Sequence, residues 1–197
     1  MTRTRTFLYG LALVAATAAI TGTVTSQGKP DDNKPDYSRP TAQHDLLDRL
    51  WGKWVYDVTI PGGPGEESLR LSLKADYTWV LGGRFLIGRY DGYVDGELFK
   101  GREILAYDAF RGEYRSLWID NNTTAFTLST GHYDRKKNIL TFDGIQDDVE
   151  RDLKDQKFRT VYRFGEVDSF VMEIWRAGPN GELAKGTVVT ATREGAE

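Results

Sequence analysis

Between residues 53 and 193 the sequence alternates hydrophobic and polar residues with a period of two. The pattern is clearest near the start, where residues 54, 56, 58 and 60 are all hydrophobic and Asp57 and Thr59 lie between them. Alternation of this kind indicates β-strands with one buried face. The period predicts about ten short strands. They are expected at residues 54–60, 69–74, 78–81, 84–93, 101–108, 113–120, 123–134, 139–143, 157–164, 169–176 and 185–193.

Short turn sequences separate these runs. They are Gly82-Gly83, Asp95-Gly96, residues 110–112, Asn121-Asn122, residues 136–138 and residues 179–181. Turns of this length join antiparallel neighbours. The sequence therefore predicts an all-β fold, either an antiparallel barrel or a sandwich. The longer acidic connection at residues 144–156 is expected to be a loop.

The segment before the first strand has helical spacing instead. Within residues 42–50, Leu46, Leu47 and Leu50 fall on one helix face, and Gly52 is a typical residue to follow a helix end. This predicts one short helix ahead of the strands, and the folded domain is expected to span residues 42–197.

The first 41 residues differ in composition from the rest of the chain. Arg3 and Arg5 precede an apolar run of about 14 residues, whereas a membrane span needs about 20. We therefore expect residues 1–26 to be a signal peptide, with a retained membrane anchor as the alternative. Residues 27–41 are rich in proline and charge, which is typical of a flexible leader. The mature protein is then exported, periplasmic or secreted, with no stable membrane span.

Composition narrows the possible chemistry. The chain has 197 residues, which favours one domain, and its formal charge of -3 gives no basic footprint for nucleic acid. It has no cysteine, which excludes disulfides, thiol nucleophiles and thiolate metal sites. Its two histidines, His44 and His132, are too few for a histidine-rich metal site, and no metal site is predicted.

Several motifs together resemble known families. Gly52-Lys53-Trp54 at the first strand and Arg193 at the last resemble the calycin superfamily. A narrower set of motifs, in order and spacing, resembles DUF1579, a family of uncharacterised, lipocalin-like proteins. These are His44-Asp-Leu-Leu-Asp-Arg-Leu-Trp-Gly-Lys-Trp54, Leu81-Gly-Gly-Arg-Phe-Leu86, Ala106-Tyr-Asp108, Thr130-Gly-His-Tyr-Asp134 and Gly178-Pro-Asn-Gly181. The resemblance covers roughly residues 42–193.

The resemblance implies a calycin-type barrel of about 8–10 strands around an internal lumen, with Trp54 and Arg193 packed together as a structural lock. On this basis we expect a small, mostly apolar ligand in the lumen. The alternating pattern of the strands places Tyr56, Phe126, His132, Tyr162 and Met172 at positions expected to face the lumen, which makes them candidate ligand-binding residues. Arg84 is a further candidate. Two alternatives stay open: Arg84 lies outward on a polar rim, or aromatic side chains fill the lumen and leave no cavity.

The sequence offers little evidence for a catalytic site. The chain has no Gly-x-Ser-x-Gly, phosphate-loop or Gly-x-Gly-x-x-Gly motif, and Ser129 and His132 would lie on opposite faces of a strand. An enzyme that uses Tyr56, Arg84, Glu103 or His132 as acid, base or anion clamp remains the alternative function. Haem is not expected, because no histidine follows residue 150, and no cofactor is predicted.

Overall fold

The computed structural model describes residues 35–63, 65–149, 151–178 and 180–196. The chain divides into two units, residues 1–35 and residues 36–197, and the second unit carries the fold. The expected signal peptide, and the expected leader up to residue 34, lie outside the described residues. Among the described residues, no helix is both long and apolar enough to cross a membrane.

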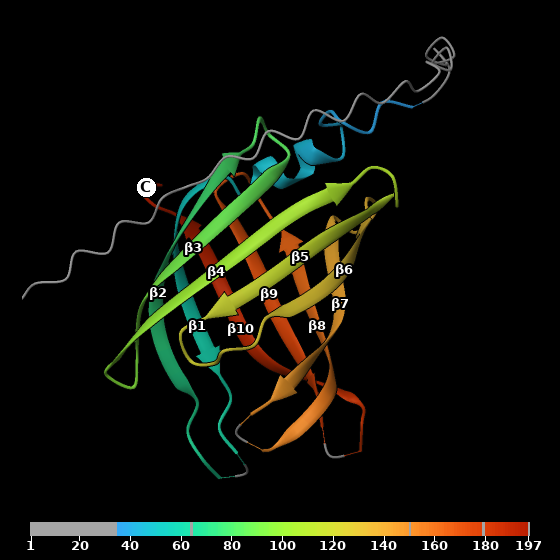
Figure 1. Ribbon diagram of the computed structural model, residues 1–197. Coiled ribbons are helices and arrows are strands. Elements are labelled where there is room, and N and C mark those ends of the chain that lie inside the picture. Colours follow the sequence, from blue (N-terminus) through green and yellow to red (C-terminus); the bar gives the residue numbers. More distant parts are fainter. Residues whose placement is uncertain (1–34, 64, 150, 179, 197) are drawn as a thin grey trace, which may run out of the picture. The chain divides into compact units, whose positions relative to one another are not determined.

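Ten antiparallel strands form a closed barrel (Figure 1). Each strand pairs with the next one along the chain, and β1 pairs with β10 to close the sheet. This confirms the predicted all-β antiparallel barrel. The strands are β1 (Gly52–Ile60), β2 (Leu69–Val80), β3 (Phe85–Val94), β4 (Glu97–Asp108), β5 (Glu113–Asp120), β6 (Thr127–Asp134), β7 (Ile139–Asp148), β8 (Leu153–Phe164), β9 (Ser169–Ala177) and β10 (Leu183–Arg193).

A short 3-10 helix, η1 (His44–Arg49), precedes β1 and lies across one end of the barrel (Figure 1). Leu47 and Leu50 are fully buried and belong to the hydrophobic core. The main-chain N–H of Thr41 donates a hydrogen bond to Nδ1 of His44 at 3.0 Å, and burial lowers the pKa of this histidine. Side chains of η1 therefore close this end of the barrel.

The predicted contact between Trp54 and Arg193 is confirmed. The two residues are cross-strand partners of β1 and β10, and the guanidinium carbon of Arg193 lies 4.3 Å from the centroid of the Trp54 ring. Arg193 also donates hydrogen bonds to the main-chain oxygen of Trp51 (2.7 Å) and to Asp168 (2.7 Å). The indole N–H of Trp54 donates to the main-chain oxygen of Leu50 (2.8 Å). The first and last strands are thus joined where η1 meets the barrel.

Gly52 makes room for this contact. Its φ of 102° lies in the region that L-residues with side chains rarely adopt. A Cβ atom at this position would lie 2.8 Å from Nη1 of Arg193. Gly52 therefore does more than end the helix: it lets the guanidinium reach across the start of β1.

Two sequence-based boundaries were wrong. Residues 144–156, expected to form a loop, continue β7 and β8 as paired strands up to a turn between Asp148 and Leu153. Their side chains are exposed or only half-buried, so no buried face imposed hydrophobic alternation on them. The segments predicted at residues 69–74 and 78–81 are one continuous strand, β2.

We expect Arg193→Met to lower the free energy of unfolding by about 2 kcal/mol, because it removes the cation from the Trp54 ring and leaves the oxygen of Trp51 without its donor. Chemical denaturation measures the effect. Lys74→Met is the matched control, since it breaks only the exposed ion pair with Glu194 next to Arg193 and should cost less than about 1 kcal/mol. Equal losses in the two variants would contradict the assignment of Arg193 as a structural lock.

Candidate functional site

The lumen contains a cavity of about 320 Å³. It extends from Glu103 and Tyr162 to Ile60, Asn122 and Arg176, which lie near the strand ends away from η1. Most of its wall is apolar. The wall includes Val58, Leu71, Phe99, Phe142, Phe158, Met172, Ile174 and Val189. The aromatic side chains therefore line the lumen without filling it.

Glu103 on β4 is the centre of a hydroxyl cluster at the inner end of this cavity. The residue is only 6% exposed. It accepts hydrogen bonds from four hydroxyl groups, on β2, β3, β5 and β8. The donors are Tyr77 (3.1 Å), Tyr90 (2.8 Å), Ser116 (3.2 Å) and Tyr162 (3.0 Å). The hydroxyl of Tyr56 on β1 extends the cluster by a hydrogen bond to Tyr77 at 3.1 Å, and Tyr77 and Tyr90 are also hydrogen-bonded to each other.

Burial controls the electrostatics of the cluster. Desolvation raises the pKa of Glu103, and the hydrogen bonds from the surrounding hydroxyls oppose the shift without cancelling it. Burial also raises the pKa values of Tyr77, Tyr90 and Tyr162 well above the ordinary value, so these phenols keep their protons. The inner end of the cavity therefore holds one carboxyl group within a set of neutral hydroxyl donors.

Glycines on neighbouring strands let these large rings point inward together. Gly88 on β3 pairs with Tyr77 on one side and with Glu103 on the other. A Cβ atom at Gly88 would lie 2.6 Å from the Tyr77 ring. In the same way, a Cβ at Gly101 would collide with the ring of Trp118. The missing side chains give the aromatic rings the space that they occupy beside Glu103.

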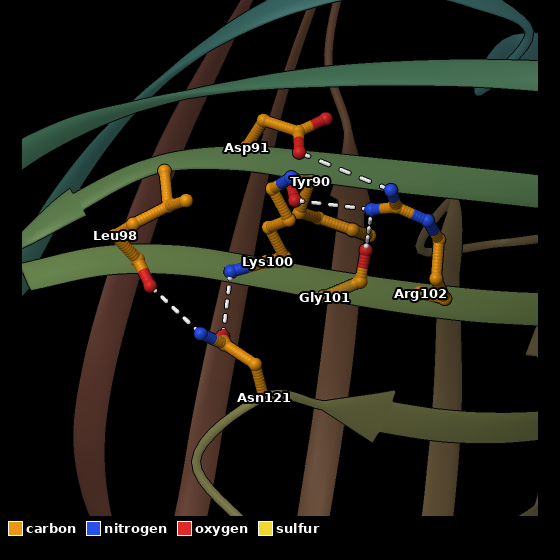
Figure 2. A network of polar contacts seen from close by, with 7 residues as sticks. All are labelled: Tyr90, Asp91, Leu98, Lys100, Gly101, Arg102 and Asn121. Carbon is orange, nitrogen blue, oxygen red and sulfur yellow. Dashed lines mark hydrogen bonds and ion pairs between the residues drawn. The ribbon is translucent and has the colours of Figure 1, made fainter. Parts of the chain in front are cut away.

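Polar side chains outside the barrel hold the backbone behind Tyr90 (Figure 2). Arg102 donates hydrogen bonds to the main-chain oxygens of Tyr90 (3.3 Å) and Gly101 (2.6 Å), which are cross-strand partners. Asn121, just after β5, accepts one hydrogen bond from the main chain of β4 and donates another to it, both at 2.7 Å. These contacts keep β3, β4 and the end of β5 in the register that places Tyr90 next to Glu103.

Three of the six candidate ligand residues line the cavity, and three do not. Tyr56, Tyr162 and Met172 line it, as predicted from their inward phase. Arg84 lies outside the cavity lining, in the turn between β2 and β3, and donates hydrogen bonds to the main-chain oxygens of Ser38 and Leu81. This is the outward position that the sequence left open as the alternative.

The inward phase predicted for residues 126–132 was wrong. Phe126 is 64% exposed, Leu128 is 55% exposed, and His132 is exposed on the outer face of β6. Ser129 and Gly131 point inward instead, because the Phe142 ring of β7 occupies the space in front of Gly131. The hydrophobic residues of β6 therefore predicted the wrong inward face, and His132 contributes no group to the lumen.

From the sequence, Glu103 was only one acid–base candidate among several, and Tyr77, Tyr90 and Ser116 were not predicted as site residues. A signal was present on β3, where Gly88 and Gly92 flank Tyr90 at a spacing of two. In a strand, this spacing places one large inward ring between two inward positions without side chains. Such a pattern indicates close packing inside a barrel.

A second cavity, of about 360 Å³, is a groove on the outer wall lined by His132, Thr141, Val161 and Trp175 among others. Its charged side chains pair with one another or with close neighbours. The pairs are Lys137–Asp134, Arg159–Asp143 and Arg163–Glu173. We assign the candidate site to the lumen, because it alone of the two cavities contains a buried carboxyl group, and no described residue forms an ion pair with that group. Within the described part of the chain, no cluster of three or more histidine or acidic residues is arranged to hold a metal ion.

Comparisons with known proteins identify a family but no activity. The sequence profile described as "Protein of unknown function (DUF1579)" matches residues 39–193. This confirms the resemblance seen in the sequence motifs. Among curated proteins, none matches the chain significantly. The crystal structure of Rv2717c from M. tuberculosis has a similar fold, with a TM-score of 0.57 and 13% sequence identity over 79% of this chain and 99% of that one. At this identity the likeness concerns the fold alone.

The raised pKa of Glu103 predicts a pH dependence of stability. A carboxyl group that holds its proton more tightly in the folded state stabilises the fold below its ordinary pKa of about 4.5, and this contribution is lost as the pH rises through the folded value. We therefore expect the unfolding free energy of the wild type, minus that of Glu103→Gln, to fall as the pH rises above 4.5.

Chemical denaturation of both proteins over a pH series measures this difference. Subtracting the variant removes the contribution of other titrating groups, which the two proteins share. A difference that rises with pH, or that stays constant, would show that Glu103 is not held with a raised pKa.

Proposed function

This chain belongs to the DUF1579 family, a family of unknown function, and we propose that it binds a small, mostly apolar molecule in the lumen of its barrel. The observation that carries the proposal is the 320 Å³ cavity, which has apolar walls and one polar cluster at its inner end. Ligand pockets in proteins are typically about 300–1,000 Å³ and combine such walls with a few well-placed polar groups. The cavity lies at the small end of this range, which favours a compact ligand.

The walls and the inner end of the cavity have different roles in this proposal. Burial of ligand surface against Val58, Met172 and Ile174 supplies most of the affinity, because it removes apolar area from water on both sides. Tyr56 and Tyr162 present aromatic surface to the cavity while their hydroxyls are held by the cluster. The cluster then fixes the orientation of a ligand through hydrogen bonds.

An enzyme is the second candidate function, and the buried Glu103 is the observation that favours it. Carboxyl groups with raised pKa values are common among catalytic acids and bases. Of the four acid–base or anion-clamp candidates from the sequence, however, only Tyr56 and Glu103 line the lumen. They belong to a single hydrogen-bonded cluster, in which the tyrosine holds its proton. Binding therefore remains the function that the geometry supports best.

Export is part of the proposal. It is supported by the sequence of residues 1–26, with two arginines before a short apolar run and small residues after it. The absence of cysteine means that the barrel can fold with no disulfide chemistry in an oxidising compartment.

We expect Val58→Phe to weaken binding of an apolar probe about tenfold, because the larger side chain enters the cavity and takes the space of the ligand. The probe is 2-naphthylmethanol, and isothermal titration calorimetry measures its affinity. Val55→Phe is the matched control, since Val55 is on the same strand with the opposite phase and is absent from the cavity lining.

The control should bind the probe as the wild type does. Equal affinity in Val58→Phe and the wild type would place the probe outside the lumen. No saturable binding to the wild type would contradict the proposed function itself.

The export proposal predicts a shortened chain. Expression of the full sequence in a bacterial host should yield a periplasmic protein whose mass corresponds to loss of about 26 residues, as expected for signal-peptide cleavage. Intact-protein mass spectrometry of the periplasmic and cytoplasmic fractions measures this. A full-length protein in the cytoplasmic fraction would contradict the proposal.

A further inference from the structure

The hydroxyl groups around Glu103 already use their hydrogens in hydrogen bonds within the cluster. Each hydroxyl carries one hydrogen, and an ionised carboxylate carries none. Tyr77, Tyr90, Tyr162 and Ser116 each donate to Glu103. With the hydrogen of Tyr77 used in this way, the Tyr56–Tyr77 hydrogen bond takes the hydrogen of Tyr56. The Tyr77–Tyr90 hydrogen bond shares a hydrogen that one of these two residues also gives to Glu103, so five hydroxyl hydrogens serve six contacts and none is left over. The cluster therefore presents only acceptor lone pairs to the cavity, which are complementary to a hydrogen-bond donor.

Among the residues that the structure describes, none supplies an opposite charge to Glu103 inside the barrel. In the part of the chain that the structure describes, its hydrogen-bond partners are all hydroxyl groups, and it takes part in no ion pair. The one basic side chain among the described residues of the cavity wall is Arg176, near the strand ends at the outer part of the cavity. A buried charge without a counter-ion is unfavourable, so the inner end of the cavity favours a cationic group over an anionic one.

Aromatic rings beside Glu103 also favour a cation. Trp118 is the cross-strand partner of Glu103, and its ring centroid lies 4.9 Å from that of Tyr90. The ring of Tyr56 follows at 5.5 Å from Tyr90. All three residues line the cavity. The faces of such rings carry negative potential and attract cations within about 6 Å. The carboxylate and the rings thus favour the same kind of group.

We propose that the ligand carries a positively charged amine, which binds at Glu103, on an apolar body that lies along the cavity wall. This inference rests on the proposed function, because it specifies the chemical class of molecule that the lumen takes. An anionic ligand is disfavoured, since its charge would meet the carboxylate. A neutral apolar ligand fits the walls but leaves the acceptors of the cluster without a donor.

Three probes with the same apolar body separate these possibilities. They are 2-naphthylmethylamine, 2-naphthylmethanol and 2-naphthoate, titrated into the wild-type protein near neutral pH by isothermal titration calorimetry. We expect the amine to bind at least about tenfold more tightly than the alcohol, as one charge-assisted hydrogen bond provides. The carboxylate should bind most weakly of the three.

Variants then assign the preference to Glu103. Glu103→Gln should remove the advantage of the amine over the alcohol, because that advantage comes from a charge-assisted contact that the alcohol lacks. Glu113→Gln is the matched control. It removes the same charge from β5, where Glu113 pairs with Arg115 and is absent from the cavity lining, and it should keep the preference.

The outcomes distinguish this inference from the proposed function. Equal binding of amine and alcohol to the wild type, or an amine preference that survives in Glu103→Gln, overturns the amine inference and leaves lumen binding intact. Equal loss in Glu113→Gln also overturns it, because the preference then comes from overall charge. Binding of none of the probes overturns both.

If Glu103→Gln does not fold, an NMR measurement on carbon-labelled wild-type protein tests the inference instead. It follows the resonance of the Glu103 carboxyl carbon during titration with each probe. The amine should shift this resonance and the alcohol should leave it in place. A resonance that responds equally to both probes overturns the inference.

Discussion

Glu103 draws hydroxyl groups from four other strands to one point inside the barrel. Its partners lie on β2, β3, β5 and β8, and Tyr56 on β1 joins through Tyr77. A buried carboxylate is tolerated only when such partners satisfy it. The hydrogen bonds therefore fix the inward orientation of rings from both sides of the lumen. The shape of the cavity and its polarity depend on this one group.

The two ends of the barrel differ because their side chains differ. At one end, η1 and the contact between Trp54 and Arg193 join the first strand to the last and fill the interior. Beyond Glu103, the rings of Trp118 and Phe158 lie against glycines, and the cavity remains. The closed end thus supplies stability, while the other end leaves the cavity.

Much of the fold could be predicted from the sequence. Alternation from Trp54 onward indicated the strands and the inward phase of Tyr56, Tyr162 and Met172, because each lies on a strand with one buried apolar face. The same rule failed on β6, where the inward residues are Ser129 and Gly131. There the space is filled by the Phe142 ring of β7. The sequence of one strand does not indicate which side chains of the neighbouring strand occupy the space in front of it.

The site was harder to predict than the fold, for the same reason. Tyr77, Tyr90 and Ser116 are ordinary strand residues in the sequence and acquire their role only through cross-strand register. The strands of residues 144–156 were missed because their side chains are exposed or only half-buried, so no burial pattern marks them. In both cases pairing between distant segments determined the result, and alternation within one segment did not.

The proposed role of Glu103, at the inner end of the lumen, is to bind the charged group of a ligand. The most direct test is a crystal structure of the protein with 2-naphthylmethylamine. We expect the naphthalene ring between Val58 and Ile174, with the amine nitrogen within hydrogen-bond distance of a Glu103 carboxylate oxygen. An amine bound in the outer groove, or in the lumen with its nitrogen directed away from Glu103, would contradict the claim.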